Sequence, residues 1–323
     1  MRTLIFLCLV PFSLGDTVLV TTGYNKENGE LASCEIIDLT SGQVCAPVPD
    51  FPLTLKGAGG ALLGGIPTVC GGYSSATNEF QNICYQFNQA GNEWVEFAVM
   101  ELTRYAPYVI ALSDNELWIT GGTSFDGETD QVDGLVPGYT KTTEILSADG
   151  TVRRGPDLPE PSHSHCMALM DGQIYLIGGE ATYSSKATYR LDLSSFEAGN
   201  WIDNGEMEYK RYGHACDVFE DQHGKKEVVA VGGDGYGTAE VYSVSHGKWH
   251  SAPDTTKAMF YPQAVTIGNT FGIMGGSGYD FTYWDDLLEY GQHAWTQRGN
   301  LALQVPRREF VAIAVPDSYC VPQ

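Results

Sequence analysis

The sequence predicts an all-β fold, a six-bladed β-propeller in which six four-stranded sheets form a closed ring. Two observations predict it. A short apolar run followed by a glycine pair occurs five times, and the pairs begin at residues 71, 121, 178, 232 and 275. Strand-like repeats of about 40 to 50 residues are typical of propeller blades, each of which needs neighbours to bury its faces. In addition, residues 309–315 read as a strand with no glycine pair after it.

The blades can be assigned in chain order. The first covers residues 17–53, with strands at 17–24 and 34–39, and it lacks an innermost strand. The second begins near Lys56 and has expected strands at 60–63, 68–70, 82–87 and 93–97. The other four are expected at 104–161, 162–211, 212–259 and 260–306. The strand at 309–315 then completes the first blade, so that the C-terminal strand pairs with the N-terminal blade and leaves no open sheet edge.

The glycines and aromatic residues of the repeat have separate physical roles. A strand that meets a tight turn against a neighbouring backbone needs residues without Cβ that tolerate positive φ. After four of the glycine pairs comes a tyrosine and then a tryptophan, whose large rings we expect to pack between adjacent sheets. These pairs are Tyr85 and Trp94, Tyr189 and Trp201, Tyr242 and Trp249, and Tyr290 and Trp295.

A glycine pair followed by tyrosine and then tryptophan resembles the kelch repeat, and the resemblance covers nearly all of residues 16–323. It implies a six-bladed propeller with four-stranded blades. Two units depart from the pattern. The third carries a long insertion between Gly122 and Glu144 and has no later tryptophan, and the first has only Gly23 and no tryptophan. These departures leave the strand limits of both units open.

The first fifteen residues have the features of a secretory signal peptide. Arg2 is basic, residues 4–10 form a short apolar stretch, and Ser13 and Gly15 are small residues before a cleavage point. The apolar stretch is too short to cross a membrane. We therefore expect a secreted, extracellular protein without a membrane span, in which residues 16–323 form the propeller.

The chain is strongly acidic. It has 18 lysines and arginines against 40 aspartates and glutamates, which gives a formal net charge of −22 at pH 7. This charge argues against nucleic acid or an anionic membrane as the partner, because both are attracted by positive surfaces.

Seven cysteines follow the predicted signal peptide, and in an oxidising compartment most of them should be paired. Cys34 and Cys45 flank one expected hairpin, and Cys70 and Cys84 flank another. Each of these pairs could cross-link neighbouring strands of one blade.

The remaining cysteines are less local. Cys166 and Cys216 occupy equivalent positions in successive blades, where they form a disulfide or lie buried as small apolar side chains. Cys320 is expected to be the unpaired cysteine.

Basic and aromatic residues gather just before the expected innermost strands, in loops that should converge at one mouth of the central channel. Guanidinium groups bind carboxylates in a bidentate manner, and aromatic rings stack on peptides or sugars. In kelch-like propellers these loops commonly bind partner proteins. The alternative is that each arginine is a structural residue paired with an acid of the next blade. The candidate ligand-binding residues are Lys56, Arg104, Tyr105, His163, His165, Arg211, Tyr212, His214, Tyr261, Arg307 and Arg308.

Two enzymatic alternatives use the same region. Galactose oxidase, a copper enzyme, shares the kelch architecture, and His163, His165 and His214 lie near the mouth among many tyrosines. No match to its ligand motif can be assembled, however. A sugar epimerase is the other alternative, with arginine and Glu309 near the mouth. Imidazoles and thiolates at His163–Cys166 and His214–Cys216 could also bind zinc or copper, unless the thiols are oxidised.

The insertion at residues 124–133 carries several closely spaced acids. Oxygen clusters of this kind suit calcium, but the spacing of an EF-hand is missing, so a solvated acidic loop is expected. A long insertion in a compact fold can also serve as a partner-binding projection.

The preferred interpretation is a secreted binding module that recognises an acidic extracellular protein or glycan, and no cofactor or metal is expected. The enzymes described above are the alternative, and a structural component of an extracellular matrix is the second alternative. Fold alone does not decide among them.

Overall fold

The computed structural model describes residues 16–125, 138–180, 185–221, 223–233, 235, 237–267, 270–291 and 294–321. The predicted signal peptide and residues 126–137 of the acidic insertion lie outside this part of the chain.

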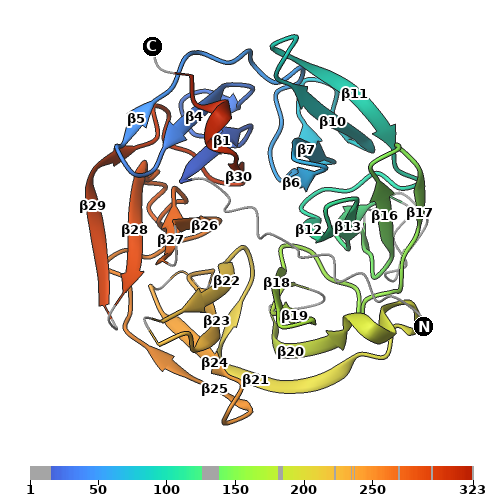
Figure 1. The fold of residues 1–323 in the computed structure, drawn as a ribbon, viewed down its shortest axis with the longest axis vertical. Helices are drawn as coiled ribbons and strands as arrows, with labels where there is room; N and C mark the ends of the chain where they lie inside the picture. The colour runs from blue at the N-terminus through green and yellow to red at the C-terminus, as the bar shows by residue number, and fades with distance from the viewer. Residues whose placement is uncertain are drawn as a thin grey trace, which may run out of the picture.

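The described residues form a ring of six four-stranded antiparallel sheets, as predicted (Figure 1). From the channel outward, the first blade contains β30 (Val311–Val315), β1 (Thr17–Thr21), β4 (Cys34–Asp38) and β5 (Gln43–Val44). The second contains β6 (Gly59–Leu63), β7 (Ile66–Cys70), β10 (Ile83–Asn88) and β11 (Glu93–Val99). The third contains β12 (Tyr108–Ser113), β13 (Glu116–Thr120), β16 (Thr143–Ser147) and β17 (Val152–Arg154).

The other three blades repeat this order. The fourth contains β18 (Cys166–Met170), β19 (Gln173–Ile177), β20 (Ser185–Asp192) and β21 (Ile202–Arg211). The fifth contains β22 (Ala215–Glu220), β23 (Lys226–Val231), β24 (Ala239–Ser243) and β25 (Lys248–Ala252). The sixth contains β26 (Gln263–Ile267), β27 (Thr270–Met274), β28 (Asp286–Gly291) and β29 (Ala294–Ala302).

Short elements decorate the loops between these strands. Three two-stranded hairpins follow the second strands of the first three blades: β2 (Tyr24–Asn25) with β3 (Gly29–Glu30), β8 (Tyr73–Ser74) with β9 (Glu79–Phe80), and β14 (Thr123–Ser124) with β15 (Gly138–Tyr139). Two 3₁₀ helices are also present, η1 (Leu193–Ala198) and η2 (Asp317–Tyr319). None of the described helices is long and apolar enough to cross a membrane.

The C-terminal strand closes the ring, as the sequence predicts. β30 pairs antiparallel with β1, with Thr17 opposite Val315 and Thr21 opposite Val311. A disulfide between Cys45 and Cys320 then ties the residues after β30 to the end of β5. The first blade is therefore assembled from both ends of the described chain.

The disulfide predicted between Cys34 and Cys45 is wrong. In the hairpin of β4 and β5, Ile37 lies opposite Val44, and the Cys45 amide donates to the Ile36 carbonyl. Cys34 is therefore two positions out of register with Cys45, which pairs instead with Cys320. Cys34 keeps a free thiol, 2.9 Å from the Thr21 hydroxyl.

The other two disulfides join the residues named from the sequence. Cys70 and Cys84 face each other directly in β7 and β10 and are bonded. Cys166 and Cys216 join β18 to β22, which are the inner strands of the fourth and fifth blades.

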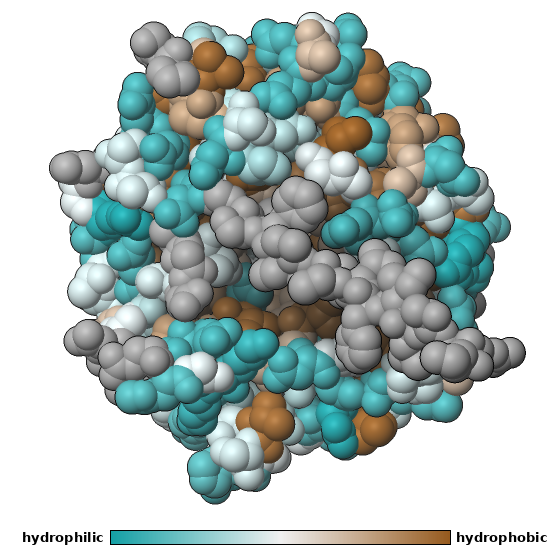
Figure 2. All heavy atoms as spheres, in the orientation of Figure 1, coloured by the Kyte–Doolittle hydropathy of each residue, from teal (hydrophilic) through white to brown (hydrophobic). Residues whose placement is uncertain are grey.

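The hydrophobic core is divided into six clusters, and each lies between two adjacent blades. Trp94 and Trp249 are 9% exposed and pack in two of these interfaces, on Phe51 and Tyr242 respectively. Because every blade contributes to two interfaces, burial depends on closure of the ring. Figure 2 shows that the perimeter of the molecule in this view is largely hydrophilic, as an acidic chain requires.

Candidate functional site

The loops before the six inner strands share one backbone geometry. In each loop one residue has a left-handed conformation with φ between 51° and 61°: Gly57, Ala106, Ser164, Gly213, Tyr261 and Glu309. From Gly57 to Tyr261, the amide of each member donates to the carbonyl of the previous one, for example Ala106 to Gly57 at 2.8 Å and Tyr261 to Gly213 at 2.7 Å. Gly57 in turn donates to the Glu309 carbonyl at 2.9 Å, which links the second blade to the first.

Four of these six residues are not glycine. A left-handed conformation costs a residue with Cβ roughly 1–2 kcal/mol, so the hydrogen-bonded ring must hold Ala106, Ser164, Tyr261 and Glu309 in place. Hydrogen bonds between neighbouring loops thus hold the backbone at the mouth of the channel. In five of the loops the residue before the left-handed one forms a β-bridge with the residue that follows a glycine pair, or Gly23 in the first blade, as His163 does with Glu180 and Arg308 with Tyr24.

The prediction that Arg104, Arg211 and Arg307 bind the ligand is wrong, because all three are buried in ion pairs. Arg104, Arg211 and Arg307 are at most 1% exposed. Their guanidinium groups contact a glutamate in the third strand of the blade that they precede, at 2.9 Å, 2.9 Å and 3.4 Å: Arg104 with Glu144, Arg211 with Glu240 and Arg307 with Glu35. They are structural residues, and in each case the acid belongs to the blade that follows the arginine in the ring, as the structural alternative from the sequence expected.

A short motif in the sequence marks these pairs. A serine or threonine stands two positions before each glutamate, and its hydroxyl accepts a hydrogen bond from the same guanidinium at 2.9–3.0 Å: Thr142, Thr238 and Ser33. In the sixth blade the corresponding pair is Lys257 with Asp286, and Trp284 stands at the hydroxyl position with the Lys257 ammonium 4.5 Å from its ring. A search for this motif could have identified the arginines as structural.

His165 and His214 are buried rather than exposed at the rim, and both are among the residues that line the cavity below it. Each ring packs against the glycine pair of the blade before it, His165 beside Gly121 and His214 beside Gly178. His165 Nε2 lies 2.8 Å from the Thr120 hydroxyl. Burial lowers the pKa of His165 to about 3 and that of His214 well below its usual value, so both rings are neutral packing groups at pH 7.

The other candidates do face the mouth, and an acid that was not among the predicted binding residues joins them. Glu309 accepts a hydrogen bond from the Tyr105 phenol at 2.7 Å, and its second oxygen lies 3.2 Å from Arg308 Nε. The Arg308 guanidinium lies within 6 Å of the ring centres of Tyr24, Tyr261 and Tyr283. Lys56 lies between Tyr24 and Tyr73 and 3.8 Å from Glu30.

On the other side of the mouth the contacts are different. His163 donates from Nε2 to Glu180 at 3.0 Å and stacks on Tyr139, with ring centres 4.4 Å apart. Burial lowers the pKa of His163, although Glu180 acts in the opposite direction. Tyr212 contacts Tyr261 with ring centres 6.3 Å apart.

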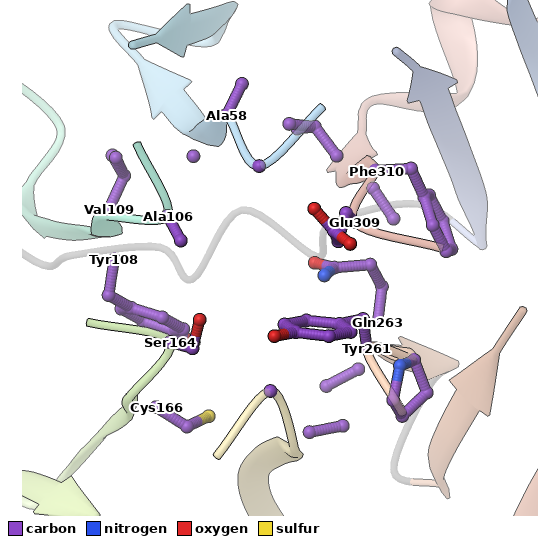
Figure 3. Close-up of a pocket in the computed structure, with 18 of the residues that line it drawn as sticks. Ala58, Ala106, Tyr108, Val109, Ser164, Cys166, Tyr261, Gln263, Glu309 and Phe310 are labelled. Carbon is purple, nitrogen blue, oxygen red and sulfur yellow. The ribbon is translucent and has the colours of Figure 1, made fainter. Parts of the chain in front are cut away.

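Below the mouth is a cavity of about 150 Å³ along the channel axis. Figure 3 shows Tyr261, Gln263 and Glu309 pointing into it from one side and Tyr108 and Ser164 from the other. Burial, followed by the charge of Glu309, raises the pKa of Tyr261, so this phenol stays neutral and can donate a hydrogen bond. A cavity of this size accommodates a small ring or one side chain rather than a large ligand.

Four of the residues of the metal alternative have other partners. Cys166 and Cys216 form a disulfide, and His165 and His163 bond to Thr120 and Glu180. Within the described residues no group of three or more histidine, cysteine or acidic side chains is arranged to hold a metal ion. The acids of the insertion at 126–133 lie outside the described residues.

The fold is a six-bladed β-propeller, and its sequence is similar to those of kelch-like proteins. The kelch-like protein 25 sequences of Rattus norvegicus and Mus musculus are each 24% identical over 206 residues, which cover 62% of this chain and 33% of theirs. The chain thus spans about a third of the length of these curated relatives. No protein-family model matches.

A solved structure gives the same result for the fold. The structure of YjhT matches with a TM-score of 0.72 at 15% sequence identity, and the match covers 88% of this chain and 95% of that one. The resemblance to kelch-type propellers is confirmed, weakly in sequence and over most of the chain in fold.

Proposed function

We propose that this chain is a secreted binding module that recognises a protein partner at the mouth of the channel. The observation that carries the proposal is the meeting of Tyr105, Tyr261, Arg308 and Glu309 above the cavity, from three different blades. Their backbones repeat from blade to blade, whereas their side chains do not. A rigid frame with variable side chains is suited to recognition, since little conformational entropy is lost on binding.

The acidic ligand suggested by the sequence receives less support from the geometry. Arg104, Arg211 and Arg307 are buried, and the two basic side chains discussed above at the mouth, Lys56 and Arg308, each contact a carboxylate. We therefore place the partner's contacts mainly on aromatic and hydrogen-bonding groups.

Secretion is part of the proposal. Three disulfides are compatible with an extracellular location, because such bonds persist in oxidising compartments. Expression of the full-length chain in a eukaryotic cell line should release the protein into the medium with its N-terminus near Asp16, as read by N-terminal sequencing. Retention of the protein in the cell would contradict this part.

The binding site is tested by comparing variants as capture reagents. Immobilised wild-type protein and a Lys248→Ala control, altered at an exposed residue of β25, should retain the same extracellular proteins. Tyr261→Ala and Arg308→Ala should lose them. Equal retention by all four proteins would overturn the assignment of the mouth as the binding site. Binding to glycans on an array, in place of proteins, would change the proposed partner from a protein to a glycan.

A further inference from the structure

One corner of the mouth, which we name the Glu180 corner, combines a carboxylate with aromatic rings. It consists of Tyr139, His163, Glu180 and Tyr212. The imidazole of His163 donates to Glu180 at 3.0 Å and stacks on Tyr139 at an interplanar angle of 10°. Burial, and after it the charge of Glu180, raise the pKa of Tyr139 and of Tyr212, so both phenols lie within electrostatic reach of that carboxylate.

Glu180 differs from the other mouth carboxylates in its partner. Glu30 lies near Lys56, and Glu309 lies near Arg308. Among the described residues, the basic side chain within ion-pair distance of Glu180 is His163, whose lowered pKa keeps it neutral at pH 7. Among the described residues, no lysine or arginine therefore lies within ion-pair distance of the Glu180 carboxylate, whose side chain is 30% exposed.

We propose that the Glu180 corner binds a lysine or arginine side chain of the protein partner. This inference rests on the proposed function and names the chemistry of one contact within it. The cation would lie between the Glu180 carboxylate and the faces of Tyr139 and Tyr212. A partly desolvated carboxylate and aromatic faces are the two groups that together favour a cation.

The protein already uses this chemistry on the opposite side of its mouth. Lys56 lies 5.2 Å and 5.4 Å from the ring centres of Tyr24 and Tyr73, with Glu30 nearby. There the cation comes from the chain itself, whereas among the described residues the carboxylate of the Glu180 corner has no lysine or arginine within ion-pair distance, although the charge of Arg308 does reach Tyr212. A net charge of −22 also steers a cationic partner toward this protein.

The probes are four short peptides, acetyl-Ala-X-Ala-amide, in which X is lysine, arginine, norleucine or glutamate. Norleucine keeps the aliphatic stem of lysine and removes only the charge. Binding to the full chain is followed at low salt by the NMR signals of the His163 imidazole. The lysine and arginine peptides should shift these signals in a saturable way, and the norleucine and glutamate peptides should not.

Variants then assign the effect to the corner. Glu180→Gln should weaken binding of the lysine peptide about tenfold, because a paired charge and its desolvation are lost. Tyr212→Leu should weaken it less. Glu79→Gln is the matched control, because it removes one exposed acid from the β8–β9 hairpin and changes net charge equally. Thermal melts of all variants should match the wild type.

Two results would overturn the inference: no binding of either cationic peptide, or equal effects of Glu180→Gln and Glu79→Gln. Its failure can be separated from failure of the proposed function. Suppose that the Tyr261→Ala and Arg308→Ala variants lose a partner that the Glu180→Gln variant retains fully. The mouth would then remain the binding site, and the cationic contact at Glu180 would be excluded.

Discussion

Tyr105 and Glu309 are 204 residues apart in the chain, and the Tyr105 phenol donates a 2.7 Å hydrogen bond to the Glu309 carboxylate. The bond connects the rim of the third blade to that of the first, and the Tyr105 ring passes over Gly57 of the second blade, where a Cβ would lie 2.4 Å from the ring. One side chain thus braces three blades at the mouth.

Tyr105→Phe should lower the free energy of unfolding by about 2 kcal/mol, because it leaves a buried carboxylate without a charge-assisted hydrogen bond. Urea denaturation measures the change. Tyr73→Phe is the control, since its phenol bonds to the exposed side chain of Asn78 and its loss should cost little. Equal effects of the two variants would contradict the bracing role.

The buried ion pairs predict a larger effect. Glu144→Gln should destabilise the protein by about 3–5 kcal/mol, because it leaves the Arg104 guanidinium buried without its counter-charge. The double variant Arg104→Met with Glu144→Leu should recover much of that loss. As a surface comparison, Glu116→Gln, which breaks a half-exposed pair with Arg153, should cost no more than about 1 kcal/mol. Urea denaturation of the three variants decides, and a small effect of Glu144→Gln would contradict this account.

The disulfide that closes the ring should stabilise it more than the disulfide within one blade. Cys45 and Cys320 are separated by 275 residues, and Cys70 and Cys84 by 14. In the chain-entropy account, loss of the longer link costs about 5 kcal/mol and of the shorter about 3 kcal/mol. Paired Cys→Ser variants, compared by denaturation, should show that order. Faster hydrogen exchange in β1 and β30 of the Cys45→Ser/Cys320→Ser variant would locate the opening.

The fold could be predicted from the sequence because its signals are local and repeated. Each glycine pair indicates one turn after a strand, and the strand at 309–315 can be recognised as unpaired with a repeat because no glycine pair follows it. A disulfide between residues far apart in the chain could not be predicted from such local signals. The partner of Cys45 depends on the hairpin register and on the path of the last residues, which no local pattern reports.

The sequence predicts where the candidate site lies, but not which side chains of its loops belong to it. The loops before the inner strands do form the mouth, yet side chains at successive positions of one loop point in different directions. Arg307 turns into the first blade and is buried, while the next residue, Arg308, faces the mouth. The left-handed residue of this loop is Glu309, which directly follows the two arginines. Its backbone conformation could not be read from an acidic residue.

The buried histidines predict loss of stability in acid. An unfolded chain protonates its imidazoles near pH 6.5, whereas folded His165 does so only near pH 3. The unfolded state therefore binds more protons between these values. The histidine contribution is complete above about pH 6.5 and declines as the pH falls, by up to about 1.4 kcal/mol per pH unit for each histidine.

His214→Phe tests this dependence, because Phe310 occupies the equivalent position in the first blade, against Gly275. The variant should show a shallower decline of the free energy of unfolding between pH 6.5 and pH 4.5 than the wild type, measured by urea denaturation at each pH. Parallel curves would show that His214 is protonated equally in both states.

The free thiol of Cys34 should be inert in the folded protein. Burial raises its pKa to about 11, so at pH 8 only about one thiol in a thousand is the reactive thiolate. Iodoacetamide should modify Cys34 slowly in the native state and rapidly in guanidinium chloride, as shown by mass spectrometry of the peptide that contains it. Fast native labelling would mean that the edge of the first blade opens readily. A peptide that resists labelling even after denaturation, with a mass deficit, would indicate a crosslink of the kind that a copper oxidase requires.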